Sequence, residues 1–109
     1  MDDALAIDAL GALAHAGRLA VFRLLVRRGP RGTPAMEVGK ALDMKPSTLS
    51  GHLSALKRAG LVTSERRHRE ILYAPDFAAV NGLVAFLLED CCDGNPDACA
   101  GFRSVTAQV

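Results

Sequence analysis

The first 42 residues of the chain place apolar residues at helical spacing and predict three helices. Within residues 2–14, large apolar side chains recur every two or three positions, which predicts a first helix. Its expected buried stripe consists of Leu5, Ile7, Leu10 and Leu13. Residues 18–28 are apolar on most of their circumference, a pattern typical of a buried helix. Residues 34–42 predict a short amphipathic helix, which we expect Thr33 to cap and Pro34 to begin.

Two further helices are predicted at residues 46–59 and 77–88. The helix at 46–59 has an apolar stripe of Leu49, Leu53 and Leu56. Its opposite face is small, polar and basic, and consists of Ser47, Gly51, Ser54 and Arg58. Two helices joined by a few residues, the second with a slim hydroxyl-bearing face, are what a helix-turn-helix needs to enter the major groove of DNA.

Between these two helices the pattern changes to period two, which predicts a β-hairpin. Val62 and Ser64 lead into a basic stretch, and Ile71 to Tyr73 follow it, so we place the turn at residues 67–69. The expected fold class is therefore mainly α with a small β-hairpin, a winged helix-turn-helix. At 109 residues the chain fits one domain, 1–109, with residues 89–109 as a cysteine-containing C-terminal tail.

Charge is segregated along the chain, although the net charge is only +1. Residues 18–69 hold twelve of the thirteen Lys and Arg residues against three acidic residues, a local net charge of +9, whereas the remainder carries −8. A basic centre between acidic ends favours contact with a polyanion such as DNA. The same residues would also suit solvated helix surfaces, so charge alone leaves both interpretations open.

The run from Ser50 to Val62, Ser-Gly-His-Leu-Ser-Ala-Leu-Lys-Arg-Ala-Gly-Leu-Val, resembles the recognition helix of the ArsR/SmtB family of metal-responsive bacterial repressors. This resemblance implies a homodimer built on the first and last helices, which binds double-stranded operator DNA with two-fold symmetry. It also places Ser47, Thr48 and Ser50 at positions that usually contact DNA. Gly51 stands where many relatives carry a long polar side chain, so phosphate contacts are expected to carry more of the affinity.

The expected DNA contacts come from the outer face of helix 46–59 and from the hairpin tip. The arginines at this tip are too far from the expected hydrophobic core to contribute to it. The expected DNA contacts are Ser47, Thr48, Ser50, Ser54, Arg58, Arg66, Arg67 and Arg69. His52, at helical spacing from Leu49 and Leu56, is interpreted as a histidine beside the core with a satisfied hydrogen bond.

The candidate metal ligands are the three cysteines, Cys91, Cys92 and Cys99. Thiolates suit soft, thiophilic ions, and As(III) takes three sulfurs in a pyramid. In the ArsR/SmtB family, such a cysteine pair with a third shortly after it resembles an arsenic- or antimony-sensing variant, so the inducer is expected to be As(III), Sb(III) or methylarsenite. Cys91 also continues the apolar stripe of the last helix, which would suit a core residue instead.

Two other regulatory functions and an enzymatic one are the alternatives to a metal-responsive repressor. A redox-sensing repressor would use the same cysteines as a thiol/disulfide switch, but the neighbouring acidic residues oppose thiolate formation. A constitutive DNA-binding regulator would have the same basic centre. An enzyme is not expected, because no nucleophile with a base and no phosphate-binding glycine loop can be assembled. We expect a cytoplasmic protein without a membrane segment or an organic cofactor.

Overall fold

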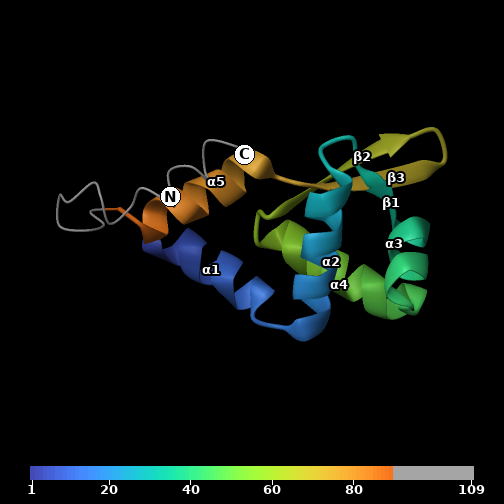
Figure 1. The fold of residues 1–109 in the computed structure, drawn as a ribbon, viewed down its shortest axis with the longest axis horizontal. Coiled ribbons are helices and arrows are strands. Elements are labelled where there is room, and N and C mark those ends of the chain that lie inside the picture. The colour runs from blue at the N-terminus through green and yellow to red at the C-terminus, as the bar shows by residue number, and fades with distance from the viewer. Residues whose placement is uncertain (90–109) are drawn as a thin grey trace.

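The computed structural model describes residues 1–89. Along these residues, five α-helices and three β-strands follow one another (Figure 1). Their bounds are α1 Asp3–Leu13, α2 Ala16–Arg28, β1 Thr33–Pro34, α3 Ala35–Leu42, α4 Pro46–Arg58, β2 Val62–Arg67, β3 Glu70–Pro75 and α5 Phe77–Leu87. The predicted winged helix-turn-helix is confirmed, with α3 and α4 as the helix pair and the β2–β3 hairpin as the wing. The expected tail, 89–109, lies outside the described residues apart from Glu89.

The core is built around α2 and the apolar stripe of α4. Leu49, Leu53 and Leu56 are buried, as their spacing predicts. The buried helix predicted at 18–28 corresponds to α2, which packs against α1, α3, α4 and β3. Six side chains in this core are almost completely inaccessible, namely Val21, Leu25, Val38, Leu53, Leu56 and Leu61. This core fixes α4 with its polar side outward.

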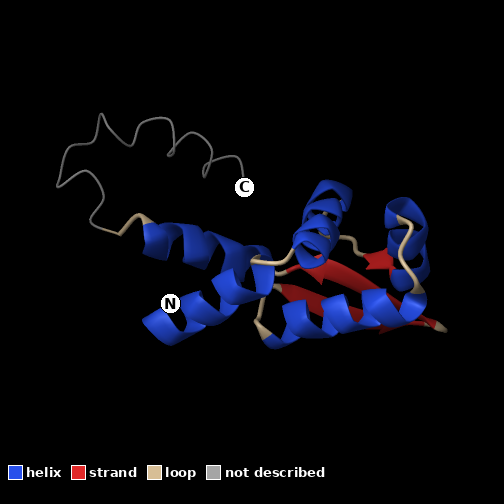
Figure 2. Cartoon of the chain, turned by 90° about the horizontal axis from the view of Figure 1, so that it is seen from below, coloured by secondary structure: helices blue, strands red, loops and turns tan. Residues whose placement is uncertain are grey.

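The sheet contains a strand that the sequence pattern did not predict. β3 lies in the middle, with β2 on one side and the two-residue β1 on the other, all antiparallel (Figure 2). Thr33 is buried in β1 and pairs with Tyr73, so its expected role as the cap of α3 was wrong. Pro34 is the N-cap residue rather than the first helical residue. A residue before proline favours extended backbone, and proline is tolerated in an edge strand, so this segment joins the sheet.

The first helix buries a different face from the one predicted. Asp2 caps α1, because its carboxylate accepts a hydrogen bond of 2.8 Å from the backbone N–H of Leu5. The buried residues are Ala6, Ala9 and Ala12, whereas the predicted stripe is largely exposed, with accessible fractions of 54% for Leu5, 66% for Ile7 and 43% for Leu10. Small side chains let α1 approach its neighbours closely, which leaves its large apolar residues on the surface.

The last helix lies beside the first at the end of the molecule away from the wing (Figures 1 and 2). Asp76 caps α5 by accepting a hydrogen bond of 3.1 Å from the backbone N–H of Ala79. The apolar stripe predicted for this helix consists of Val80, Leu83, Val84, Leu87 and Leu88. Leu83 is buried, but Leu87 is 52% exposed. Exposed apolar residues from α1 and α5 therefore occur at the same end of the molecule.

No single helix within residues 1–89 is both long and apolar enough to cross a membrane. Taken together, α1 and α2 are long and apolar enough for such a span, by length and composition only. The two helices are bent by 100° relative to each other.

Candidate nucleic-acid interface

The outer face of α4 is small, polar and accessible. Pro46 occupies the first turn, where its missing N–H costs no helical hydrogen bond. All five residues predicted from this helix to contact DNA are exposed, namely Ser47, Thr48, Ser50, Ser54 and Arg58. A β-carbon added at Gly51 would meet no atom within 4 Å, so nothing in the described chain fills the space in front of the helix there. This face can approach the floor of a DNA groove closely.

The wing carries the predicted arginines around a two-residue turn. Arg67 pairs with Glu70 across the hairpin, which leaves His68 and Arg69 as the turn, within the predicted range 67–69. His68 adopts a left-handed backbone with φ of 56°, as turns of this length require. Arg66, Arg67 and Arg69 are all exposed and extend the basic surface beyond α4.

Two of the wing arginines already have partners within the hairpin. Arg66 donates from Nε to the carbonyl oxygen of His68 at 3.5 Å. Arg67 Nε lies 3.8 Å from Glu65 Oε1, and both side chains are more than 60% exposed. An exposed ion pair of this kind is worth less than about 1 kcal/mol, so a DNA phosphate can compete for Arg67.

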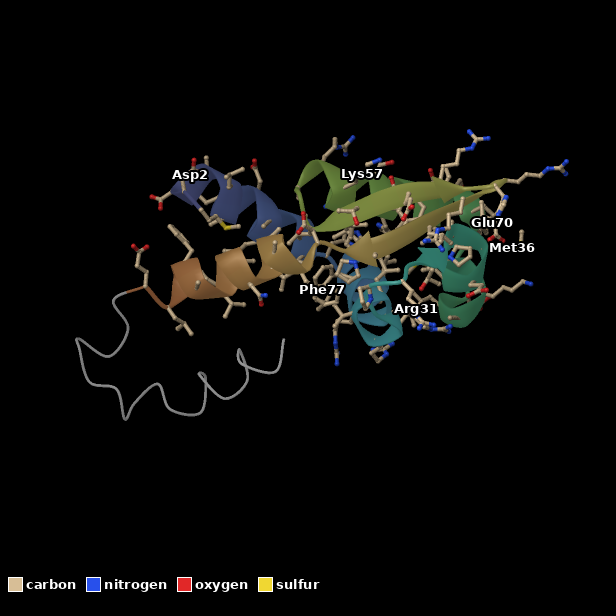
Figure 3. The ribbon with its side chains drawn as sticks, turned by 90° about the horizontal axis from the view of Figure 1, so that it is seen from above. Asp2, Arg31, Met36, Lys57, Glu70 and Phe77 are labelled. Carbon is tan, nitrogen blue, oxygen red and sulfur yellow. The ribbon has the colours of Figure 1, made fainter. Side chains whose placement is uncertain are left out.

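One side-chain hydrogen bond connects α4 with strand β2 of the wing. Lys57, in the last turn of α4, donates from Nζ to Ser64 Oγ on β2 at 2.6 Å. Figure 3 shows Lys57 where α4 lies beside the hairpin. The sequence did not indicate this contact, because the two residues come from separate elements, although both lie within the basic centre, residues 18–69.

His52 lies on the inner side of α4, against the start of α2. Its ring centroid is 5.0 Å from that of His15, and a β-carbon at Gly17 would lie 2.5 Å from its Nε2 atom. Burial lowers the pKa of His52, and the neighbouring His15 and Arg18 add to this effect. The hydrogen bond expected for this histidine is not found among residues 1–89. His15 instead accepts one from the backbone N–H of Gly17 at 3.1 Å, which caps α2.

The cysteines predicted as metal ligands, Cys91, Cys92 and Cys99, lie outside the described residues. Within residues 1–89, no group of three or more His, Cys, Asp or Glu side chains is arranged to hold a metal ion. The chain enters the cysteine segment directly after α5, which packs beside α1.

Comparison with known proteins identifies the family. Residues 13–65 match a family described as a helix-turn-helix domain. Over 78 residues, the sequence is 35% identical to the HTH-type transcriptional regulator YgaV of Escherichia coli K12, covering 72% of this chain and 77% of that protein. The fold is similar to an ArsR-like transcriptional regulator from Rhodococcus sp. RHA1, with a TM-score of 0.71, 25% identity, and coverage of 94% of this chain and 92% of the other. The chain belongs to the ArsR/SmtB family of transcriptional regulators.

Other solved structures in the family bear on assembly and ligands. A homodimeric winged helix-turn-helix DNA-binding domain from Mycobacterium bovis has a TM-score of 0.63 and 25% identity, covering 87% of this chain and 94% of the other. An antimony-specific repressor, AntR, has a TM-score of 0.59 and 26% identity, covering 74% and 72%. A "possible transcriptional regulator for arsenical resistance" has a TM-score of 0.64 and 28% identity, covering 73% and 80%. As an ArsR/SmtB protein with such relatives, the chain is a transcriptional regulator with a helix-turn-helix for DNA binding.

Proposed function

We propose that this ArsR/SmtB protein is a repressor that binds a two-fold symmetric operator as a homodimer and leaves it when As(III) binds the C-terminal cysteines. Ser47, Thr48, Ser50, Ser54 and Arg58 of α4 enter the major groove. Arg66, Arg67 and Arg69 of the wing hold the backbone or the minor groove. The support is the accessible polar face of α4, next to a hairpin tip that extends the same basic surface.

The DNA contacts divide into two kinds with separate tests. Because phosphate contacts carry no direct base information, Arg67→Ala should weaken binding to operator and random duplexes nearly equally. Ser50→Ala changes a residue on the groove-facing side of α4 and should reduce the preference for operator over random DNA. Affinity should fall with salt, with a log–log slope of about −0.9 for each phosphate neutralised. A salt-independent affinity would contradict the proposed interface.

The proposed dimer forms through α1 and α5. Its support is the apolar surface at their shared end, to which Leu5, Ile7 and Leu10 of α1 and Leu87 of α5 contribute, each between 43% and 66% exposed. Such residues gain stability when a second copy covers them. Two copies related by a two-fold axis would place their α4 helices roughly 34 Å apart, one turn of DNA, or a small multiple of that distance.

The dimer surface is tested by a charge placed at its most exposed apolar residue. Ile7→Lys should yield a folded monomer in sedimentation equilibrium and lose most operator affinity, because one copy contacts only half a site. Val26→Lys, at an apolar residue of α2 that is 40% exposed, is the matched control and should remain dimeric. Equal dimerisation of both variants would place the interface elsewhere.

The proposed inducer site consists of Cys91, Cys92 and Cys99 with As(III) bound to their three sulfurs. The support is the chemistry of the donor set, three soft thiols without a histidine nearby, and the similarity to regulators named for antimony and arsenical resistance. Sb(III) has the same preference for thiolates, and methylarsenite needs only two of them. Since the segment follows α5 directly, binding there can act on the dimer end of the fold.

The switch requires strong coupling between the cysteines and the DNA. Moving the protein from about 99% to about 1% in the DNA-competent state requires an ion that prefers the released state by roughly 10⁴-fold, on the order of 5.5 kcal/mol. Bonds between arsenic and three sulfurs can supply this difference, whereas exposed ion pairs of up to about 1 kcal/mol cannot.

The experiment measures operator release by arsenite for the wild type and for Cys91→Ser, Cys92→Ser and Cys99→Ser under reducing conditions. Each variant should bind operator normally and respond less to arsenite, with Cys99→Ser the mildest if the inducer is methylarsenite. If the triple variant is released at the wild-type arsenite concentration, the inducer site is wrong. Release by an oxidant but not by arsenite would favour the redox switch, and release by neither would favour a constitutive regulator.

A further inference from the structure

A small polar recess lies where α1, α2 and α4 meet. It has a volume of about 290 Å³. Three alanines and three charged residues line it, namely Ala12, Ala55, Ala59, Asp8, Arg18 and Arg58. The short alanine side chains leave room between the helices, and two arginines from different elements line this space, Arg18 from α2 and Arg58 from the last turn of α4.

Arg18 has a buried donor without a partner. Its Nε atom is inaccessible and makes no hydrogen bond to any part of residues 1–89. Asp8 lines the same recess, but neither arginine lies within 4.0 Å of its carboxylate, since the ion pairs found in this part of the chain are Arg28–Glu37 and Arg67–Glu65. Buried donors in proteins almost always have an acceptor, so the guanidinium group of Arg18 still has hydrogen-bonding capacity that neither Asp8 nor any other part of residues 1–89 uses at this Nε atom.

The residues around the recess select the charge of its ligand. Two guanidinium groups repel a cation, and the polar lining does not suit an apolar molecule. Guanidinium groups bind phosphate and similar oxyanions through two parallel N–H···O bonds. We propose that Arg18 and Arg58 form an oxyanion site that takes a phosphate group. Asp8 repels the anion and limits its affinity.

Two sources can supply the phosphate group, a free phosphate ion or the backbone of bound DNA. Arg58 belongs to the DNA-reading helix, so a backbone phosphate could reach it when α4 occupies the groove. Only this second source rests on the proposed repressor function. Binding of free phosphate can be measured without operator or inducer. The proposed oxyanion site and the proposed repressor function can therefore be refuted separately.

The first arm of the experiment titrates full-length protein with inorganic phosphate and follows the backbone amide resonances around Arg18 and Ala55. Sodium chloride at matched ionic strength is the reference. We expect saturable shifts that are at least tenfold weaker in Arg18→Gln and in Arg58→Gln. Arg23→Gln removes an exposed arginine of the same helix α2 away from the recess and should match the wild type. Arg58→Gln changes an exposed side chain, so it keeps the test valid if Arg18→Gln does not fold.

Asp8→Asn separates this proposal from the simplest rival, in which the carboxylate of Asp8 moves to pair with Arg18. If the recess binds an oxyanion, Asp8→Asn should tighten phosphate binding several-fold, because a repelling charge is removed. If Asp8 is the partner, Asp8→Asn should destabilise the protein without phosphate, and Arg18→Gln should add no further loss. That result would overturn the proposal, and so would phosphate shifts that do not saturate or that are equal in Arg18→Gln and Arg23→Gln.

The second arm identifies the source of the phosphate with random-sequence duplex DNA in phosphate-free buffer. If the backbone supplies it, Arg18→Gln should weaken binding and reduce the salt slope by about 0.9, the value for one phosphate contact. Inorganic phosphate should then also compete with DNA beyond its effect on ionic strength. If free phosphate is the ligand, Arg18→Gln should leave DNA affinity unchanged while weakening phosphate binding at least tenfold.

Discussion

Gly17→Ala should destabilise the fold through a single contact between α2 and α4. An alanine β-carbon at this position would lie 2.5 Å from Nε2 and 3.0 Å from Cε1 of His52. Real β-carbons do not approach other atoms this closely, so the ring has to move. His52 is half-buried and its ring is next to that of His15, which restricts where it can go.

Two opposing effects set the size of the change. Alanine is favoured over glycine within a helix by about 0.5–1 kcal/mol, whereas overfilling a packed site costs about 1–3 kcal/mol. The steric effect is larger, so Gly17→Ala should lower the free energy of unfolding by roughly 1–2 kcal/mol. Gly51→Ala is the control in the helix that carries His52. Its added β-carbon meets no atom within 4 Å, so this change should raise the free energy of unfolding by about 0.5–1 kcal/mol.

The assay is urea unfolding followed by circular dichroism at one fixed protein concentration, because a dimer's stability depends on concentration. His52→Ala removes the obstructing ring. In that background, Gly17→Ala should become neutral or stabilising, which gives a coupling energy of about 1–3 kcal/mol between the two sites. If Gly17→Ala has the same effect with and without the histidine ring, the contact does not limit this position and the reasoning is wrong.

Three further predictions concern the wing, the effect of pH and the core. Glu65→Gln frees Arg67 from its exposed ion pair, so affinity for operator and random DNA should rise together by less than about fivefold, measured by fluorescence anisotropy. Burial lowers the pKa of His52 in the folded protein, so the unfolded chain takes up this proton first as the pH falls below about 6.5. Stability should therefore decrease from pH 7 to 5, and His52→Gln should flatten that decrease in urea titrations. Leu56→Ala removes a completely buried side chain and should cost about 2–5 kcal/mol, whereas Leu19→Ala, at a side chain that is 42% exposed, should cost under about 1 kcal/mol.

The sequence alone was sufficient for the helix-turn-helix and its wing. In α4, leucines at spacing three and four leave only one face to bury, and the opposite face carries no large apolar residue to compete for the core. The change to period two around residues 67–69 likewise predicts a hairpin with its turn there, and the structure supplies the register, in which Val62 pairs with Pro75 and Arg67 with Glu70. Local pattern and global packing agree in these elements, so the candidate DNA-binding residues could be named before the fold was known.

Only the tertiary structure decided which face of α1 is buried and which residues from separate elements are in contact. In α1 both the alanines and the large apolar residues follow helical spacing, and the choice depends on how closely neighbouring helices approach. Thr33 enters a strand because a partner, β3, lies about forty positions later and supplies the hydrogen bonds. The hydrogen bond from Lys57 to Ser64 and the burial of Nε of Arg18 depend in the same way on packing between separate elements. Periodicity records what each segment can bury, but the neighbours present in space determine what it does bury.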